Sequence, residues 1–403
     1  MKLKRKIAGP LPLFGVGCLC LLFTLACNND KTIPLSSGLA DPAQLGQRRQ
    51  ATTVVGLDST ASKVVNTFGT ANLWVGKFDN LESRFLLRFA KLSLPDTVTV
   101  VAATLKLHGI LAQGKGADFD ATIHQVTATT AWDSAKVTWG SGNFPVDFNS
   151  APMNTQRVSA VKGDSIIFKL DPVVVSSWRT VDGRQQGVLV QAPGATFMKA
   201  FGSHFSTPKQ PVVELITLKR GNTKNDTTRF SPTVSIFLFQ RLSALRQGPL
   251  YTGLGEQHVS TLFFDVSAIP KNVTISRALL TLEVDTLNSV FYSNRLDLQL
   301  SYIGPIAIPN YNFNPLRFEP FGSYQDTLRT AELDTVGAAS QQVTFAITSA
   351  VQQWVADSKN NLGVVLFPIS FSARDLARAA FYSRETAPAR APKLQIEYTL
   401  PPQ

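Results

Sequence analysis

The sequence predicts an all-β protein with two tandem antiparallel β-sandwich domains, which follow a signal segment and a flexible tether. Three observations lead to this prediction. One long segment occurs twice, short runs alternate between apolar and polar residues, and all three cysteines lie within the first 27 residues. A body without cysteine holds no disulfide staples or thiolate metal sites, so its cores must be stabilised by burial of apolar side chains.

The repeat is the strongest signal. Residues 87–107 (LRFAKLSLPDTVTVVAATLKL) return at 262–282 (LFFDVSAIPKNVTISRALLTL), 175 positions later (262 − 87), with eight identical positions. A second match lies downstream, where Trp178 and Trp354 each stand nine residues before a Gly-Val pair. Two matches in the same order at nearly the same spacing indicate a tandem duplication, and therefore two domains.

The period of the apolar residues predicts strands. In the second repeat Leu280, Leu282 and Val284 alternate with Thr281 and Glu283. Such alternation is typical of antiparallel strands with one buried face. One short helix is also predicted per repeat, and we expect the tryptophan at its end to lie in the core. Many short strands separated by turn residues favour a two-sheet sandwich.

The repeats set the predicted domain boundaries. The first sandwich covers residues 52–217 and the second covers residues 229–400, with a linker at residues 218–228. The linker segment RGNTKNDTT is polar and has no hydrophobic face, as is typical of a connection between domains.

The N-terminus predicts export and a lipid anchor. Residues 1–6 are basic and residues 7–26 are apolar, which is typical of a secretory signal. The end of this segment, Thr-Leu-Ala-Cys, resembles the bacterial lipobox, in which the cysteine is lipidated and the signal is cleaved before it. The resemblance implies a signal peptide over residues 1–26 and lipidation of Cys27; an uncleaved anchor is the alternative. The polar residues 27–51 are predicted to form a tether to the cell envelope.

Charge and composition restrict the partners. The formal net charge is +11, and loss of the four basic residues of the signal leaves about +7. A mildly basic protein is attracted to acidic polymers, lipid head groups or a negatively charged cell surface. The basic residues are scattered along the chain, so no nucleic-acid-binding arm is predicted.

Further motifs follow one another in a fixed order in the first repeat. They are L-W-V-G at 73–76, L-x-F at 87–89, A-x-L-x-L at 103–107, W-D-x-x-x-V-T-W at 132–139, G-V-L-V at 187–190, F-G-S at 201–203 and P-x-x-E-L at 211–215. This ordered set resembles the DNRLRE domains, which are related to archaeal disaggregatase. The resemblance covers the whole first repeat and, more loosely, the second, which has residues 302–324 in place of the segment at 132–139.

The resemblance implies a jelly-roll sandwich that serves as an accessory or surface module. Some relatives bind carbohydrate, with acidic polysaccharide among the ligands, and catalysis is not implied. The residues themselves agree with a protein that is not an enzyme. The four histidines lack metal-ligand spacing, and no G-x-S-x-G, H-E-x-x-H or P-loop motif occurs. A glycosidase pair among the many carboxylates is not singled out by the sequence.

Aromatic side chains are the first candidates for sugar binding, because their faces stack on pyranose rings. Trp132 and Trp139 flank a polar turn that the second repeat does not share, so they are candidates for an exposed aromatic platform. Trp74 borders another turn, where a place in the core is the alternative. Arg84 and Arg88 lie on a shared strand, where they would suit an anionic glycan.

No cofactor is predicted with certainty, and structural calcium is the one metal considered. Asp118 and Asp120 lie near Gly114 and Gly116 and are weak candidates for its ligands, because two carboxylates without a calcium-binding loop carry little information.

The favoured function is therefore a non-catalytic cell-surface lipoprotein that binds polysaccharide, with anionic polymers among the candidates. A structural or adhesive spacer without a small-ligand site is the main alternative, and a polysaccharide lyase or hydrolase is a third. Burial of Trp74, Trp132 and Trp139 would remove the best residues of the binding hypothesis. The ligand and the partner proteins are not defined by the sequence.

Overall fold

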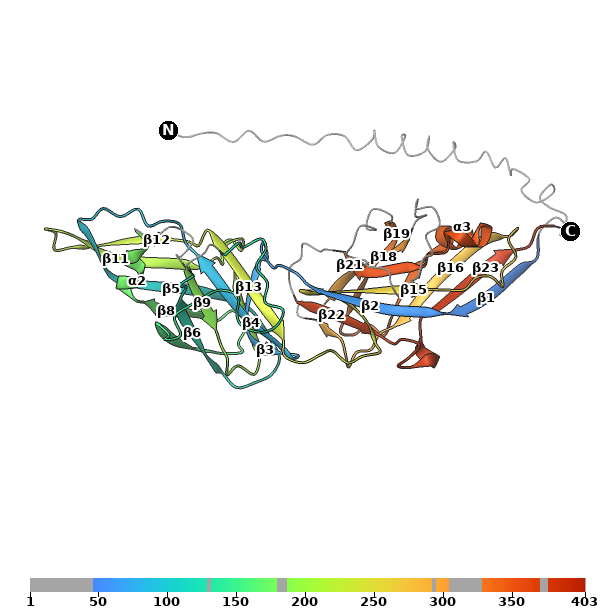
Figure 1. Ribbon diagram of the computed structural model, residues 1–403, viewed down its shortest axis with the longest axis horizontal. Coiled ribbons are helices and arrows are strands. Elements are labelled where there is room, and N and C mark those ends of the chain that lie inside the picture. The colour runs from blue at the N-terminus through green and yellow to red at the C-terminus, as the bar shows by residue number, and fades with distance from the viewer. Residues whose placement is uncertain are drawn as a thin grey trace, which may run out of the picture. The chain divides into compact units, whose positions relative to one another are not determined.

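The computed structural model describes residues 46–128, 132–179, 187–291, 295–303, 328–369 and 376–402. The predicted signal peptide, Cys27 and most of the tether lie outside these ranges. Within them the protein consists mostly of antiparallel strands with two short α-helices, which confirms the predicted β class (Figure 1). No helix in the described ranges has the length and apolar character needed to cross a bilayer.

Strands β3 to β13, which are contiguous in the sequence, form one sheet that we call the first module. Its elements are β3 (Asn72–Phe78), β4 (Leu81–Arg88), β5 (Val98–Gln113), β6 (Phe119–Gln125), β7 (Asn154–Val158), β8 (Ser165–Leu170), α2 (Pro172–Ser177), β9 (Gly187–Gln191), β10 (Met198–Gly202), β11 (Val212–Lys219), β12 (Asn225–Phe230) and β13 (Val234–Arg241). The strand order is β12-β11-β5-β10-β3-β4-β9-β6-β7, with β13 also paired to β4 and β8 to β5.

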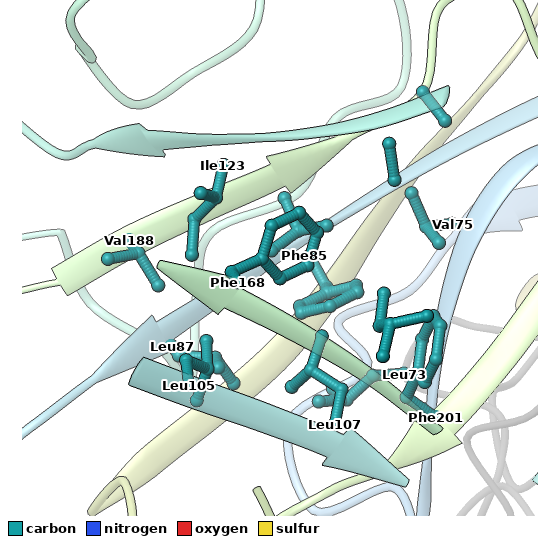
Figure 2. Close-up of a cluster of buried hydrophobic side chains, with 14 of the residues drawn as sticks. Leu73, Val75, Phe85, Leu87, Leu105, Leu107, Ile123, Phe168, Val188 and Phe201 are labelled. Carbon is teal, nitrogen blue, oxygen red and sulfur yellow. The ribbon is translucent and has the colours of Figure 1, made fainter. Parts of the chain in front are cut away.

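The length of β5 lets this sheet curl onto itself. The strand has 16 residues; its N-terminal part pairs with β11 and β8, and its C-terminal part pairs with β10. The curled sheet encloses a core in which Leu105 and Leu107 of β5 gather with Phe85 and Leu87 of β4 (Figure 2). Burial of these apolar side chains supplies the main stabilisation of the module.

The second module has two sheets. Its elements are β14 (Leu250–Leu254), β15 (Glu256–Phe263), β16 (Thr274–Glu283), β17 (Val290–Phe291), β18 (Arg295–Ile303), β19 (Leu328–Gly337), β20 (Gln342–Ala346), α3 (Thr348–Ala356), β21 (Val364–Pro368), β22 (Ala377–Phe381) and β23 (Lys393–Thr399). One sheet has the order β1-β23-β16-β20, and the other has the order β17-β22-β14-β15-β21-β18-β19 with β2 paired to β15.

Strands β1 (Arg48–Val54) and β2 (Leu57–Val64) belong to the second module, although they precede the first module in the sequence. We call residues 48–64 the N-terminal arm. In Figure 1 the blue β2 lies among the yellow and orange strands of the second module, next to β15. The chain therefore begins in the second module, builds the whole first module, and returns to complete the second.

The two modules are closed by equivalent strands in the same register. In the first module Val234 of β13 pairs with Arg88 of β4, and in the second Leu57 of β2 pairs with Phe263 of β15. Each closing strand pairs along all eight of its residues. Strand pairing therefore crosses the predicted repeat boundary at 218–228. Part of this polar segment lies in β12, which forms an exposed hairpin with β11.

The short helices and their tryptophans lie where the sequence predicts them. Asp171 caps α2 by accepting a hydrogen bond from the backbone N–H of Val173. Trp178 at the end of α2 is 2% exposed and stacks on Phe89 with ring centroids 4.9 Å apart. Trp354 in α3 is 1% exposed, so the expectation that both are core residues is confirmed.

We predict that Phe237→Ala, a change outside the predicted first domain, destabilises the first module by about 3–5 kcal/mol. Phe237 is fully buried in that module's core, so truncation leaves a cavity there. Urea unfolding followed by tryptophan fluorescence measures the effect, because four of the five tryptophans lie in the first module. Phe205→Ala is the control, since Phe205 is 52% exposed. Equal effects of the two substitutions would contradict the assignment of β13 to this core.

Candidate functional site

The structure brings four of the predicted site residues together, but it buries the aromatic ones. Trp132 is 6% and Trp139 3% exposed. The Arg88 guanidinium carbon lies 5.0 Å from the Trp132 ring centroid, and that of Arg84 lies 4.5 Å from the Trp139 centroid. Both are cation–π contacts within the protein. This corrects the expectation of an exposed aromatic platform, because apolar and arginine side chains occupy the space a sugar would need.

The segment with these tryptophans covers the outer face of the first module's sheet. It packs with apolar side chains of β4, β9 and β13 in a second buried cluster, which contains Leu86, Val126, Ala128, Trp132, Trp139, Val146, Leu189, Val234, Ile236 and Leu238. The turn between the tryptophans also binds the segment that joins the modules, because the Asn66 side chain donates to the carbonyls of Ser134 (2.9 Å) and Val137 (2.7 Å). This element therefore has a structural role.

The remaining sequence candidates do not form a site either. Trp74 has no exposed surface and belongs to the core of the first module. Asp120 forms a salt bridge of 3.2 Å with Arg157 at the surface. Among the described residues no group of histidine, cysteine, aspartate or glutamate side chains is arranged to hold a metal ion.

A polar cleft in the second module is the best candidate site in the described part of the chain. Its volume is about 350 Å³. The N-terminal arm, the segment before and within β14, and the loop after β22 supply its walls, which consist of Asp58, Ser59, Thr60, Ser62, Leu245, Arg246, Gln247, Gly248, Pro249, Leu250, Tyr251 and Glu385. Hydroxyl, amide, carboxylate and guanidinium groups therefore surround one opening.

The cleft lies where the first module has aromatic rings. In the first module Phe237 of β13 is the register partner of Phe85 of β4, whereas in the second Thr60 is the partner of Ser260. Two positions further along the closing strand, the buried Phe239 of the first module corresponds to Ser62 of the second, which is exposed and lines the cleft. Phenylalanine fills far more volume than serine or threonine, so the same backbone leaves an open polar space in the second module.

The floor of the cleft is a closed loop of hydrogen bonds. The Tyr251 backbone N–H donates to the Thr60 Oγ1 (3.0 Å), the Thr60 and Ser260 hydroxyls lie 3.0 Å apart, and the Ser260 Oγ donates to the Tyr251 carbonyl (2.8 Å). The Tyr251 hydroxyl donates to the Arg246 carbonyl (3.0 Å), and burial raises the pKa of this phenol. These bonds satisfy groups that would be costly to bury unpaired, so they fix the floor.

Two carboxylates and a cation lie at the rim. The backbone N–H of Arg384 donates to the Asp58 Oδ2 at 3.1 Å. Burial raises the pKa of Asp58 and nearby Glu385 adds to the rise, while the Arg384 backbone N–H and charge oppose it. Glu385 and Arg246 are the other charged residues of the wall. Such a rim offers both acceptors and donors to a hydroxyl-rich ligand.

Ser62 leads into a buried charged network. The hydroxyl of Ser62 lies 2.7 Å from the Nδ1 of His258, the Nε2 of His258 lies 3.4 Å from the Oε2 of Glu256, and Arg241 forms a salt bridge of 2.5 Å with the same oxygen. Burial lowers the pKa of His258. The order serine–histidine–carboxylate matches a hydrolase triad, but the carboxylate is held by arginine and the serine lies within a paired strand. We therefore interpret the network as structural.

Little in the sequence points to this site. Its residues come from segments separated by almost 330 positions, and none belongs to a motif. One available signal was the loss of aromatic residues between the repeats, since Phe237 and Phe239 correspond to Thr60 and Ser62. This correspondence can be recognised only when it is known that β2 closes the second module and β13 closes the first. Only the strand pairing shows this.

Comparisons with known proteins give no family. No family model matches the chain, and no curated protein matches it. Among solved structures, the chain is similar to the C-terminal domain of the AgI/II polypeptide BspA from Streptococcus agalactiae, with 9% identity, a TM-score of 0.15, and coverage of 87% of this chain and 91% of that chain. A second structure of the same domain, named BspA_C_WT, gives 9% identity, a TM-score of 0.15 and coverage of 86% and 90%. These similarities are too weak to support an inference about fold or function.

We predict that Glu256→Gln abolishes an acid-sensitive part of the stability. Burial raises the pKa of Glu256, but His258 and Arg241 outweigh burial and lower it from 4.5 to about 2. A lowered folded-state pKa stabilises the fold above pH 4.5, and this contribution is lost as the pH falls toward 2. The difference in unfolding free energy between the native protein and the variant should therefore shrink by about 1–2 kcal/mol over that range.

Urea unfolding of both proteins between pH 4.5 and about 2 measures this difference. Glu397→Gln is the control, because this carboxylate pairs with an exposed arginine, Arg277, at 3.8 Å. A difference between native protein and Glu256→Gln that stays constant with pH would refute the assignment.

Proposed function

We propose that the protein is a non-catalytic, cell-surface lipoprotein that binds polysaccharide in the polar cleft of its second module. The observation that carries the proposal is that Thr60 and Ser62 stand in the second module at the register positions where the first module has the core phenylalanines Phe237 and Phe239, and that a hydrogen-bonding cleft lies at this place. A cleft lined by fixed polar groups suits a ligand rich in hydroxyl groups. The proposal includes no reaction, since the serine and histidine beside the cleft belong to the structural network.

The fold and family are part of the proposal. We infer that each module is a jelly-roll sandwich and that both are related to the DNRLRE domains, as the order of motifs in the first repeat indicates. The curled sheet of the first module and the two sheets of the second are compatible with that architecture.

The charge of the cleft bears on the ligand. Asp58 and Glu385 are acidic and Arg246 is basic, so the wall carries no excess of positive charge. Arg84 and Arg88, which were candidates for an anionic glycan, are engaged with tryptophan rings in the other module. We therefore expect neutral polysaccharide to be bound at least as well as anionic polysaccharide, and calcium not to be required.

A structural or adhesive spacer is the second candidate, and a specific observation favours it. The tryptophans that looked available for ligand are buried, and residues 49–399 form one compact unit through the returning arm. A spacer needs such cohesion and no cleft. If the protein binds polysaccharide in the cleft, filling the cleft should abolish that binding. If the protein is a spacer, filling the cleft should leave its function unchanged.

We predict that native protein is retarded in affinity electrophoresis through gels that contain its polysaccharide, and that Ser62→Phe removes the retardation. The substitution places in the cleft the side chain that the first module has at the equivalent position. It leaves the net charge unchanged, so non-specific attraction to an anionic gel stays the same. Phe205→Ala, an exposed change in the first module that also leaves the net charge unchanged, is the control for folding and handling.

Four outcomes distinguish the candidates. Equal retardation of native protein and Ser62→Phe would place the binding site elsewhere. Retardation that vanishes with salt in every anionic gel would indicate charge alone. No retardation by any neutral or anionic polymer would favour the spacer. Release of reducing ends from the polymer would instead revive the hydrolase hypothesis.

We also predict that Cys27→Ser transfers the protein from the membrane fraction to the soluble fraction. Lipidation of this cysteine would anchor the chain firmly, and serine accepts no such lipid. In the sequence the tether leads into β1, which begins at Arg48 and pairs within a sheet of the second module. Partition into a detergent phase, with mass spectrometry of the N-terminus, measures the change. Cys18→Ser and Cys20→Ser are the controls, and a Cys27→Ser protein that stays in the membrane would support an uncleaved anchor.

A further inference from the structure

The hydroxyl groups on the floor of the polar cleft have a fixed hydrogen-bond polarity. The Ser260 hydroxyl donates to the Tyr251 carbonyl, which only accepts. The Thr60 hydroxyl, 3.0 Å from the Ser260 oxygen, is therefore the donor of the bond between these two side chains. The Tyr251 hydroxyl donates its own proton to the Arg246 carbonyl. Neither Thr60 nor Tyr251 thus has a hydroxyl proton left for a ligand.

Ser62 is oriented in the same way by the histidine behind it. Burial lowers the pKa of His258, so at neutral pH its ring is uncharged and carries one proton. The Glu256 carboxylate lies 3.4 Å from Nε2 and only accepts, which places this proton on Nε2. Nδ1 then accepts, and the Ser62 hydroxyl 2.7 Å away donates to it. Ser62 therefore presents lone pairs to the cleft, as Thr60 does.

The charges of the wall also favour a donor. Asp58 and Glu385 only accept when they are ionised. Burial raises the pKa of Asp58 and the charge of Glu385 adds to the rise, so the two carboxylates lie near each other. The guanidinium of Arg384, whose charge also acts on Asp58, donates to the Gly56 carbonyl. Among the described residues that line the cleft Arg246 is the one cation, so the wall has a formal charge of −1 (1 − 2) in a chain whose net charge is +11.

We propose that the polar cleft selects polysaccharide that contains amino sugars with free amino groups. This inference rests on the polysaccharide-binding function proposed above and names the chemistry of the ligand. A protonated amine brings a positive charge and three N–H donors. These donors match the hydroxyl oxygens of Thr60 and Ser62 and the two carboxylates of the wall, and hydrogen bonds between ionised groups are the strong ones.

The same polarity acts against acetylated and acidic sugars. Acetylation removes the charge and two of the three donors, and its carbonyl adds an acceptor that would face the acceptors of the floor. A carboxylate or sulfate group would meet Asp58 and Glu385 with like charge. Unpaired acceptors and like charges both lower affinity. Neutral sugars keep hydroxyl donors for the floor but lack the charge, so we expect them to bind more weakly than amino sugars.

Isothermal titration calorimetry of native protein in a non-ionic detergent tests this selection. The probes are glucosamine oligosaccharides of one length, either with free amines or fully N-acetylated, at a pH between the pKa values of Asp58 and of the sugar amine. After loss of the signal the protein carries about +7 (11 − 4), so general electrostatic attraction does not favour the cationic probe. We expect the free-amine probe to bind at least about tenfold more tightly, and Ser62→Phe to remove the binding of both.

Two variants locate the selection at the carboxylates. Glu385→Gln removes the charge of an exposed side chain and keeps its size, and Asp58→Asn does the same at the second carboxylate. Each should lower the preference for the free-amine probe at least about threefold. Glu397→Gln is the matched control, because this carboxylate pairs with Arg277 at 3.8 Å outside the cleft and its loss should keep the full preference.

The outcomes separate this inference from the proposed function. Equal or tighter binding of the acetylated probe, removed by Ser62→Phe, would overturn the inference and leave polysaccharide binding in the cleft intact. A preference that survives both Glu385→Gln and Asp58→Asn, or binding that survives Ser62→Phe, would also overturn it. Binding of neither probe would do the same, and the polysaccharide gels described above then decide whether the cleft binds another sugar.

Discussion

Eight residues of β2 pair with eight residues of β15, and this ladder joins positions about 200 residues apart in the chain. Among the described residues no other strand of the second module pairs along that edge of β15, so its sheet depends on a segment that precedes the whole first module. Closing such a loop costs conformational entropy. Hydrogen bonds of the ladder and the selective contacts of Thr60 and Ser62 offset that cost, and they make residues 49–399 one compact unit.

The same ladder explains where a ligand could bind. The closing strands of the two modules pair in the same register, and they differ in the side chains that they place over the sheet. In the first module Phe237 and Phe239 fill the core, whereas in the second Thr60 and Ser62 leave a polar cleft. The closing strand of the first module is apolar and that of the second is polar. Closure of the module and construction of the cleft depend on the same residues.

Much of the fold could be predicted from the sequence, because its signals are local. Alternation predicted the strands, Asp171 and Pro172 predicted a helix start, and Trp178 and Trp354 were placed in the core. The pairing partners could not be predicted, since a tandem repeat offers two equivalent strands for each closing position. The burial of Trp132 and Trp139 was missed because their cover, Arg84 and Arg88, comes from a strand about 50 positions earlier. The cleft was missed because it depends on that same unresolved pairing.

The most direct test of this account is a non-reducing peptide map of single chains with two engineered cysteines. Ala61→Cys with Val259→Cys joins β2 to β15, and Ala61→Cys with Arg84→Cys joins β2 to the strand of its own repeat. The account predicts an intramolecular disulfide at dilute concentration in the first protein and none in the second. A disulfide in the second protein, with none in the first, would contradict the returning arm and with it the origin of the cleft.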